Sequence, residues 1–271
     1  MKKNKSLQNS VAAVVIALFG AAETSCAGEV MNITRLGMTE KQNFEESILV
    51  LEKNIKYVQR FKEKCGPAHA SFEQIQRYYQ LQLTPEEICS PHDTDKPNAF
   101  LAFPVYDQEG NTFYNQSSRE FIQKIKENYD TFVYVARCKT DFKSSLSATP
   151  NIELLVISGH GTSSSLEFGT KQDCYPDDYE IKVPNNSAEN SLYNSDFAPL
   201  REKAVIFLNS CSAAEGGENA NNLANYVADV SKRRIIASRT KFGNEIEILS
   251  PYPLKLKIVA NGQDVTYSVK K

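Results

Sequence analysis

The chain has 271 residues, of which 24% are charged and 10% aromatic, and its formal net charge is −2 with a pI near 6.0. This length accommodates one full domain plus a smaller appendage, and the frequency of apolar side chains excludes disorder over a long stretch. Because the net charge is small and negative, the composition gives no basic footprint for binding nucleic acid.

The first 27 residues have the pattern of a secretory signal peptide. Three lysines lie among the first five residues, an apolar run covers 11–22, and small residues follow it. The run is too short to span a bilayer comfortably, so we predict no integral membrane span after the signal is cleaved. The expected location is the periplasm or the exterior of a bacterial cell. A lipoprotein anchored through Cys26 and an apolar helix retained in the mature protein are the alternatives.

The number of cysteines in the mature protein depends on the cleavage position. Cleavage after Ala27 leaves five cysteines, whereas cleavage after Ala22 retains Cys26 as a sixth. Export places the chain in an oxidising compartment, where five cysteines are typical of two disulfides and one remaining thiol. The five that both cases share are Cys65, Cys89, Cys138, Cys174 and Cys211. Their pairing stays open at the level of the sequence.

Residues 28–95 are predicted to form a helical region. Apolar side chains recur there at spacings of three and four residues, as on one face of a helix. These residues are Phe44, Ile48, Leu51, Ile55 and Val58. Gly66-Pro67 ends this helix, and Ser71 with Gln74 three residues later begins a second helix with a capping box. We expect a helical hairpin or a small helical cap, without residues of recognisable chemistry.

Between residues 96 and 250, short apolar runs alternate with amphipathic helices. This alternation predicts an α/β domain with a mostly parallel sheet covered by helices on both faces. The expected strands are 99–105, 131–136, 152–157, 204–208 and 235–237.

Two further segments of the chain have distinct patterns. Residues 162–195 have little regular periodicity, and loops of this length in compact domains are usually functional or mobile. We expect this loop to shape a substrate groove and to be cut during maturation. Near the end of the chain, Asn261-Gly262 between two apolar runs predicts a β-hairpin extension over 251–271.

Two candidate reactive residues follow two of the expected strands. His160 comes after 152–157 in the sequence Ser-Gly-His-Gly, and Cys211 comes after 204–208. Since ligands bind beyond the carboxyl ends of parallel strands, we expect the imidazole and the thiol to lie close together. A thiolate is a nucleophile, and one imidazole can stabilise it and protonate a departing amine. Backbone N–H groups near Gly161 and Cys211 are candidates to hold the oxyanion.

The residues around this pair resemble the clan of cysteine peptidases that includes caspases, legumains, gingipains, clostripain and separase. The resemblance covers about residues 99–238 and depends mainly on the blocks 154–161 and 205–212. Within these blocks, His160 precedes Cys211 by 51 residues, which matches the order and spacing of caspases. The resemblance implies a caspase-like fold in which His160 transfers the proton and Cys211 is the nucleophile.

The same resemblance implies that Gly161 and the amide of Cys211 form the oxyanion hole. The caspase pentapeptide around the nucleophile is absent, and residues 209–213 read Asn-Ser-Cys-Ser-Ala in its place. The chain therefore looks closer to divergent bacterial members, including domains of the CHAT type, and specificity for aspartate is unsupported.

The specificity of such a peptidase stays open. In the family, the stretch after the second block feeds the specificity pocket, so Arg239 is a candidate to bind an acidic substrate side chain. A solvated role for Arg239 is the alternative. Three aspartates in the long loop are candidates to favour basic substrates instead. They are Asp173, Asp177 and Asp178.

Other chemistries lack the residues they need. An α/β-hydrolase places its histidine after the nucleophile, and no histidine follows Cys211. Paired zinc ligands and a phosphate-binding loop are also missing, so we expect neither a metal nor another cofactor. The predicted function is an exported cysteine endopeptidase that acts on a peptide or protein substrate. The alternative is an inactive caspase-like binding or structural module, and a disulfide at Cys211 would favour this alternative. The sequence does not indicate the oligomeric state.

Overall fold

The computed structural model describes residues 40–66, 70–89, 95–107, 112–170, 174, 178–184, 192–241 and 245–270. The predicted signal peptide, the lipoprotein alternative and the side chains of Phe44, Ile48 and Leu51 lie outside these residues. The chain divides into two compact units, 1–56 and 57–271. No helix in the described part of the chain is long and apolar enough to cross a membrane.

The described part of the first unit is helical. It belongs to α2 (Glu40–Cys65), and its side chains Leu49 and Val50 are exposed.

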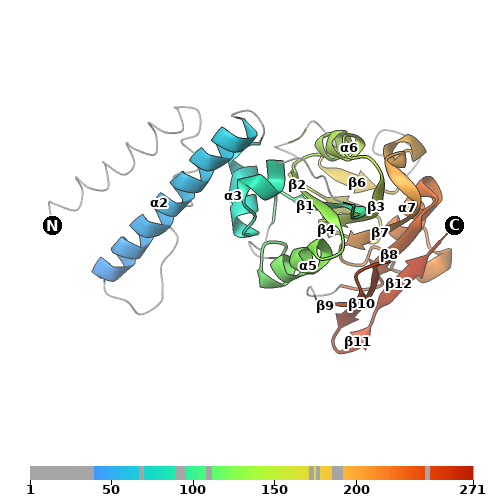
Figure 1. Cartoon of the computed structure of the whole chain (residues 1–271). Coiled ribbons are helices and arrows are strands. Elements are labelled where there is room, and N and C mark those ends of the chain that lie inside the picture. The colour runs from blue at the N-terminus through green and yellow to red at the C-terminus, as the bar shows by residue number, and fades with distance from the viewer. Residues whose placement is uncertain are drawn as a thin grey trace. The chain divides into compact units, whose positions relative to one another are not determined.

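The second unit is built on a six-stranded sheet with the strand order β12-β8-β7-β3-β1-β2 (Figure 1). Its strands are β1 (Asn98–Pro104), β2 (Asp130–Ala136), β3 (Ile152–Ser158), β7 (Leu200–Asn209), β8 (Arg234–Ser238) and β12 (Thr266–Val269). Adjacent strands pair in parallel except β12, which is antiparallel to β8. The prediction of a mostly parallel sheet is confirmed.

Helices flank both faces of this sheet. They are α5 (Gln116–Lys126), α6 (Lys139–Ser147) and α7 (Leu223–Ser231). On one face, Leu155 and Ile206 lie in a buried cluster with Phe142 of α6, and residues of α7 belong to the same cluster. Successive strand residues point to opposite faces, so Phe207 packs on the other side, where its ring centroid is 6.1 Å from that of Phe121 of α5.

The helices α3 (Phe72–Gln80) and α4 (Pro85–Cys89) follow α2, and α3 begins at the predicted capping box of Ser71. A disulfide joins Cys65 at the end of α2 to Cys89 at the end of α4. Residues 57–89 accordingly belong to the second unit.

Helix α3 covers the outer strand β2 of the sheet. The Gln74 Nε2 atom donates a hydrogen bond of 2.6 Å to the Val135 carbonyl, and the Val135 N–H donates one of 3.2 Å to the Tyr78 hydroxyl. Edge strands expose unpaired backbone groups. The side chains of α3 therefore satisfy backbone groups of β2 that no further strand pairs with.

The stretch expected to lack regular structure contains short strands. A small antiparallel sheet is formed by β4 (His160–Gly161), β5 (Ser165–Glu167) and β6 (Glu180–Lys182). The expectation of an irregular stretch over 162–195 is therefore wrong for β5 and β6, because β5 lies between β4 and β6 and pairs with both. Residues 185–191, within the predicted cleavage loop, lie outside the described residues.

The C-terminal segment forms the predicted turn at Asn261-Gly262, between β10 (Lys255–Ala260) and β11 (Gln263–Asp264). A further strand, β9 (Ile246–Ser250), pairs with β10 on its other side. The hairpin is short because the chain then passes into β12 and joins the central sheet beside β8. The extension thus completes the edge of the main sheet.

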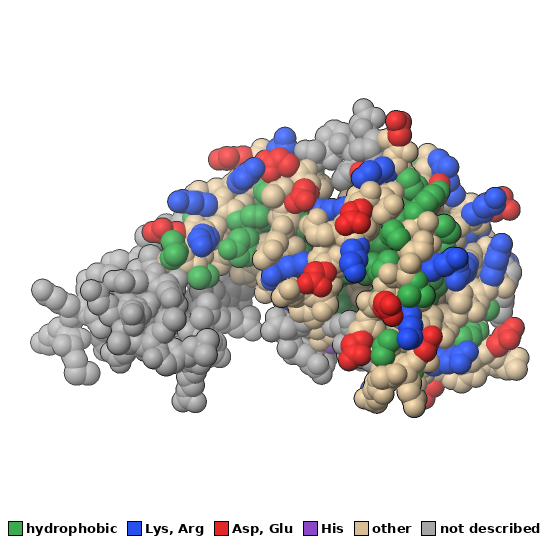
Figure 2. Space-filling view, turned by 60° about the horizontal axis from the view of Figure 1, so that its bottom comes forward, with side chains coloured by type: hydrophobic (Ala, Val, Ile, Leu, Met, Phe, Trp, Pro, Cys, Tyr) green, Lys and Arg blue, Asp and Glu red, His purple; other side chains and the backbone are tan. Residues whose placement is uncertain are grey.

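Acidic and basic side chains are interspersed on the face of the second unit shown in Figure 2. Among the described side chains visible on this face, no single-sign patch gathers over one element. This distribution accords with the small net charge of −2.

Candidate active site

The carboxyl ends of β3 and β7 lie side by side, which brings the segments carrying His160 and Cys211 together. The last pair in the register of these strands is Ser158 and Asn209. Beyond it, the Gly159 N–H donates a hydrogen bond of 3.3 Å to the Asn209 carbonyl. His160 and Cys211 each follow this pair by two residues, so the parallel sheet places both at one edge.

Gly161 packs directly against the residue before Cys211. A Cβ atom built on Gly161 would overlap the Ser210 Oγ and would lie 2.5 Å from the Ser165 carbonyl oxygen. Only glycine fits at such a close approach of side chain and backbone. Packing therefore requires a glycine after His160, independently of the predicted role of its N–H group in the oxyanion hole.

The imidazole of His160 is held by a buried carboxylate. Its Nε2 lies 3.2 Å from Asp107 Oδ1, and the second oxygen of Asp107 accepts a hydrogen bond of 3.1 Å from the Phe113 N–H. The Asp107 side chain is fully buried, whereas 26% of the His160 side chain is exposed. The Phe113 ring stands edge-on to the imidazole at 5.1 Å. These contacts fix the ring while leaving part of it accessible.

The Asp107 carboxyl is held in its charged form. Burial alone raises its pKa, but hydrogen bonds from His160 and the Phe113 amide outweigh burial, and the charges of His160 and Arg77 act in the same direction. The net result is a pKa of Asp107 below the ordinary value of 3.8. A carboxylate that is hydrogen-bonded to one imidazole nitrogen orients the ring.

Arg77 connects helix α3 to the residues around Asp107. Its Nε donates a hydrogen bond of 2.9 Å to the Val105 carbonyl, just past the end of β1, and its guanidinium lies 4.6 Å from the centroid of the Tyr114 ring. The Tyr114 hydroxyl in turn donates to the Pro104 carbonyl. Helix α3 therefore supplies a fixed positive charge behind Asp107, although no chemistry was predicted for the helical region.

Cys211 begins a tight turn after β7. It is partly exposed and lies outside the two disulfides, which join Cys65 to Cys89 and Cys138 to Cys174. Among the described cysteines, none forms the disulfide with Cys211 that would favour an inactive module. Two disulfides and one remaining thiol are the arrangement that a mature chain with five cysteines predicts.

The turn after Cys211 contains a strained residue. Ser212 has φ +56°, a left-handed conformation that costs a non-glycine residue about 1 kcal/mol or more. Hydrogen bonds to the end of β8 and to the segment after it hold this turn. The Ser212 N–H donates to the Thr240 carbonyl at 3.1 Å, and the Ala214 N–H donates to the carbonyl of Ser238, the last residue of β8, at 2.8 Å.

A pair of buried asparagines fixes the remainder of this turn. The Asn222 amide nitrogen donates to the carbonyls of Glu215 and Gly217 at 3.0 and 2.9 Å, and the Asn225 amide nitrogen also donates to Gly217 at 2.9 Å. Helix α7 begins only after Asn222, so its dipole acts weakly on Cys211. These asparagines were not predicted from the sequence, although an asparagine just before a helix is a typical N-cap.

The predicted specificity residues that the structure describes contact residues other than His160. The guanidinium of Arg239 lies 5.5 Å from the centroid of the Tyr267 ring, and its backbone N–H donates to the Val265 carbonyl. Asp178 accepts a hydrogen bond of 3.0 Å from the Thr140 hydroxyl at the start of α6. Asp173 and Asp177 lie outside the described residues. A role for Arg239 in substrate binding stays a prediction.

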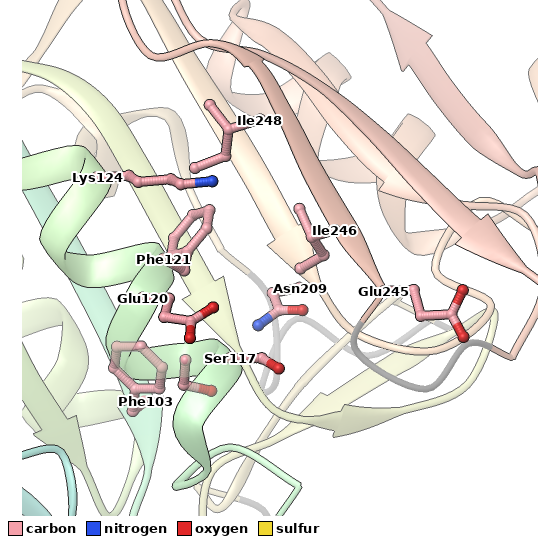
Figure 3. Close-up of a pocket in the computed structure, with 10 residues that line it drawn as sticks. Phe103, Ser117, Glu120, Phe121, Lys124, Asn209, Glu245, Ile246 and Ile248 are labelled. Atoms are coloured by element: carbon pink, nitrogen blue, oxygen red, sulfur yellow. The ribbon is translucent and has the colours of Figure 1, made fainter.

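A cavity of about 280 Å³ opens beside the end of β7 (Figure 3). It lies between α5 and β9, and its lining residues are Phe103, Ser117, Ser118, Glu120, Phe121, Lys124, Asn209, Glu245, Ile246 and Ile248. It was not predicted from the sequence, because β9 is far from α5 in the chain. Among the described residues, no cluster of three or more His, Cys, Asp or Glu residues is placed to hold a metal ion.

Comparisons with known proteins include a weak structural similarity. No family model and no curated protein matches the sequence. A solved structure described as "Structure of Protease" aligns with 64% of this chain at 14% sequence identity and a TM-score of 0.32. The chain covers 35% of that structure's own length. This similarity does not indicate a function for the chain.

Proposed function

We propose that this chain is an exported cysteine endopeptidase of the caspase-like clan, in which Cys211 attacks peptide bonds with His160 as its acid–base partner. One observation carries the proposal. Neighbouring strands end in a histidine bonded to a buried carboxylate, Asp107, and in a partly exposed cysteine outside both disulfides. This combination of nucleophile, base and orienting group is typical of nucleophilic catalysis.

The reaction follows from these groups. The His160 imidazole accepts the thiol proton, and the Cys211 sulfur attacks the carbonyl carbon of the substrate to form a tetrahedral adduct. The imidazolium then protonates the departing amine, and the adduct collapses to a thioester. Water, deprotonated by His160, attacks the thioester carbonyl and releases the acid and the thiol. Asp107 stabilises the imidazolium between these steps and keeps its ring oriented.

The oxyanion of the tetrahedral adduct needs donors that are already in place. The backbone N–H groups of Gly161 and Cys211 are assigned this role, since the segments that carry them pack together at the sheet edge. Export is supported by the sequence pattern of residues 1–27 and by the two disulfides, which are typical of oxidising compartments.

Labelling with electrophilic peptide probes tests the proposal. Probes that differ in the residue before the electrophile are incubated with the mature protein, and adducts are measured by intact-mass spectrometry. We expect one adduct on the native chain, none on Cys211→Ala and much slower labelling of His160→Ala. Thermal unfolding of both variants checks that they remain folded. Labelling that persists in Cys211→Ala, or that never occurs with any probe, would contradict the proposal.

A further inference from the structure

A polar pair is buried on the face of the sheet that α5 covers. Ser158 and Asn209 are partners in the register of β3 and β7, and the Asn209 Nδ2 donates a hydrogen bond of 3.1 Å to the Ser158 hydroxyl. Ser158 is fully buried, and Asn209 is 8% exposed. Because side chains alternate between the two faces of a strand, this pair continues the row of Val156 and Phe207, which are also buried. Figure 3 shows the Asn209 amide on the side of the sheet where Phe121 of α5 lies.

Stability alone does not explain a polar pair at the end of an apolar row. Burying an amide and a hydroxyl costs free energy that the bond between them only offsets, whereas two apolar side chains of similar shape would pack there without that cost. A hydrogen bond, unlike an apolar contact, fixes both the distance and the direction between two groups. The Asn209 Oδ1 has no hydrogen-bond partner among the described residues, so the bond from Nδ2 to Ser158 determines how the amide is oriented.

The contacts beyond this pair join the two strand ends less firmly. The Gly159 N–H donates to the Asn209 carbonyl at 3.3 Å, which is longer than the usual range of about 2.7–3.2 Å. The contact between Gly161 and Ser210 is one of packing, because the Ser210 Oγ has no hydrogen-bond partner among the described residues. The side-chain bond from Asn209 to Ser158 is therefore the shorter polar link at this edge.

The pair lies immediately before both proposed reactive residues. His160 follows Ser158 by two residues, and Cys211 follows Asn209 by two. Each Cα atom of the pair is therefore at most about 7 Å from that of the reactive residue after it. A change in the distance between the paired side chains would shift the imidazole relative to the thiol, and a displacement of about 1 Å can reduce a reaction rate about 100-fold.

We propose that Ser158 and Asn209 are positioning residues, whose side-chain hydrogen bond sets the separation of the His160 imidazole and the Cys211 sulfur. The inference rests on the proposed function, because it concerns the same two reactive residues. Ser158 and Asn209 contribute neither a proton nor a contact with the substrate, and they act through the residues that follow them. The reaction rate should therefore depend on this bond even where stability does not.

Removing both partners separates positioning from stability. Ser158→Ala or Asn209→Leu leaves one buried polar group unpaired, so each should lower the midpoint of thermal unfolding and slow the labelling of Cys211 by electrophilic peptide probes. The double variant leaves no such group, and we expect the midpoint to recover most of the loss while labelling stays about 10- to 100-fold slower than in the native chain. If labelling recovers together with the midpoint, the pair is structural only and the proposal is overturned.

The concentration dependence of labelling checks how the pair acts. The maximal rate of labelling should fall in the double variant, whereas the probe concentration that gives half of this rate should not change. A change confined to that concentration would indicate a contact with the substrate and would contradict positioning. Asn98→Leu is the matched control, since its amide donates a hydrogen bond of 2.8 Å to the Pro150 carbonyl at the opposite end of β1. This control should keep the native labelling rate.

A geometric measurement separates this inference from the proposed function. In His160→Cys, dibromobimane becomes fluorescent when it bridges the thiols at positions 160 and 211, whether or not the chain cleaves peptides. We expect bridging to be about tenfold slower when Ser158→Ala and Asn209→Leu are added. If no probe labels the native chain but bridging slows in this way, the peptidase fails and the positioning role stands. If probes label the native chain but bridging is absent or unchanged, the positioning role is overturned and the peptidase stands. Absent or unchanged bridging without any labelling overturns both.

Discussion

The ends of β3 and β7 carry the two proposed reactive residues but hold them by different means. At the end of β3, side chains position His160: a buried carboxylate, an aromatic ring and, behind them, the guanidinium of Arg77. At the end of β7, the turn after Cys211 is positioned by backbone hydrogen bonds and by the Asn222 amide. The histidine is therefore positioned largely by charged groups, whereas the turn that carries the cysteine is positioned by hydrogen bonds between neutral groups.

Asp107→Asn tests the charge at the histidine end and should have the largest effect. The amide cannot stabilise the imidazolium, so we expect the rate of probe labelling or peptide cleavage to fall by about 10²- to 10⁴-fold. Asp229→Asn, on the exposed side of α7, is the matched control and should keep the native rate. A native rate in Asp107→Asn would mean that the carboxylate does not serve His160.

The same carboxylate predicts how stability changes with acid. The pKa of Asp107 is lower in the folded chain than the ordinary value of 3.8, so its stabilising contribution is present above pH 3.8 and is lost as pH falls through the folded-state pKa. Chemical unfolding between about pH 2 and 6 should show a shallower acid dependence in Asp107→Asn than in the native chain. Parallel curves would contradict the assigned pKa shift.

Gly161→Ala tests the packing between the two ends. A methyl group there collides with the Ser210 side chain and the Ser165 carbonyl, so we expect a loss of about 1–3 kcal/mol in unfolding free energy and reduced labelling of Cys211. Adding Ser210→Ala should restore only part of the stability, because the contact with the Ser165 backbone remains. Full tolerance of Gly161→Ala would argue against the close approach.

Asn222→Ala tests the backbone geometry at the cysteine end. Loss of its amide leaves the carbonyls of Glu215 and Gly217 without these donors, and we expect about 1–3 kcal/mol of destabilisation together with slower labelling. Asn194→Ala removes one bond to the Val230 carbonyl at the opposite end of α7. This control should cost less stability and leave the labelling rate unchanged in a stopped-flow or timed mass-spectrometric assay.

Arg77→Gln should have the smallest effect on rate. Removing the guanidinium raises the pKa of Asp107 toward its ordinary value, and we expect a decrease of less than about tenfold in labelling rate. Arg77→Lys keeps the charge but loses the planar contact with Tyr114. If the labelling rate falls equally in both variants, packing against Tyr114 matters more than the charge of Arg77. The histidine end would then depend less on charge than we infer.

The two strand ends also differ in how much of each could be predicted. His160 and Cys211 follow apolar runs, and the rule that parallel strands end at one edge is enough to place them together. Asp107 was recognisable only as part of a turn, because its role depends on burial and on contact with a histidine 53 residues away. The Arg77 contact and the cavity likewise join segments that no local pattern connects.

Local patterns in the amino-acid sequence suffice for the alternation of strands and helices, the positions of His160 and Cys211 at strand ends, and the turn at Asn261-Gly262, since each depends on periodicity or on turn chemistry. Three other features required the folded chain. β12 lies beside β8, Cys211 stays outside both disulfides, and Asp107 bonds to His160. These features arise from contacts between distant segments, whose free energy comes from burial and pairing that no single stretch of the chain encodes.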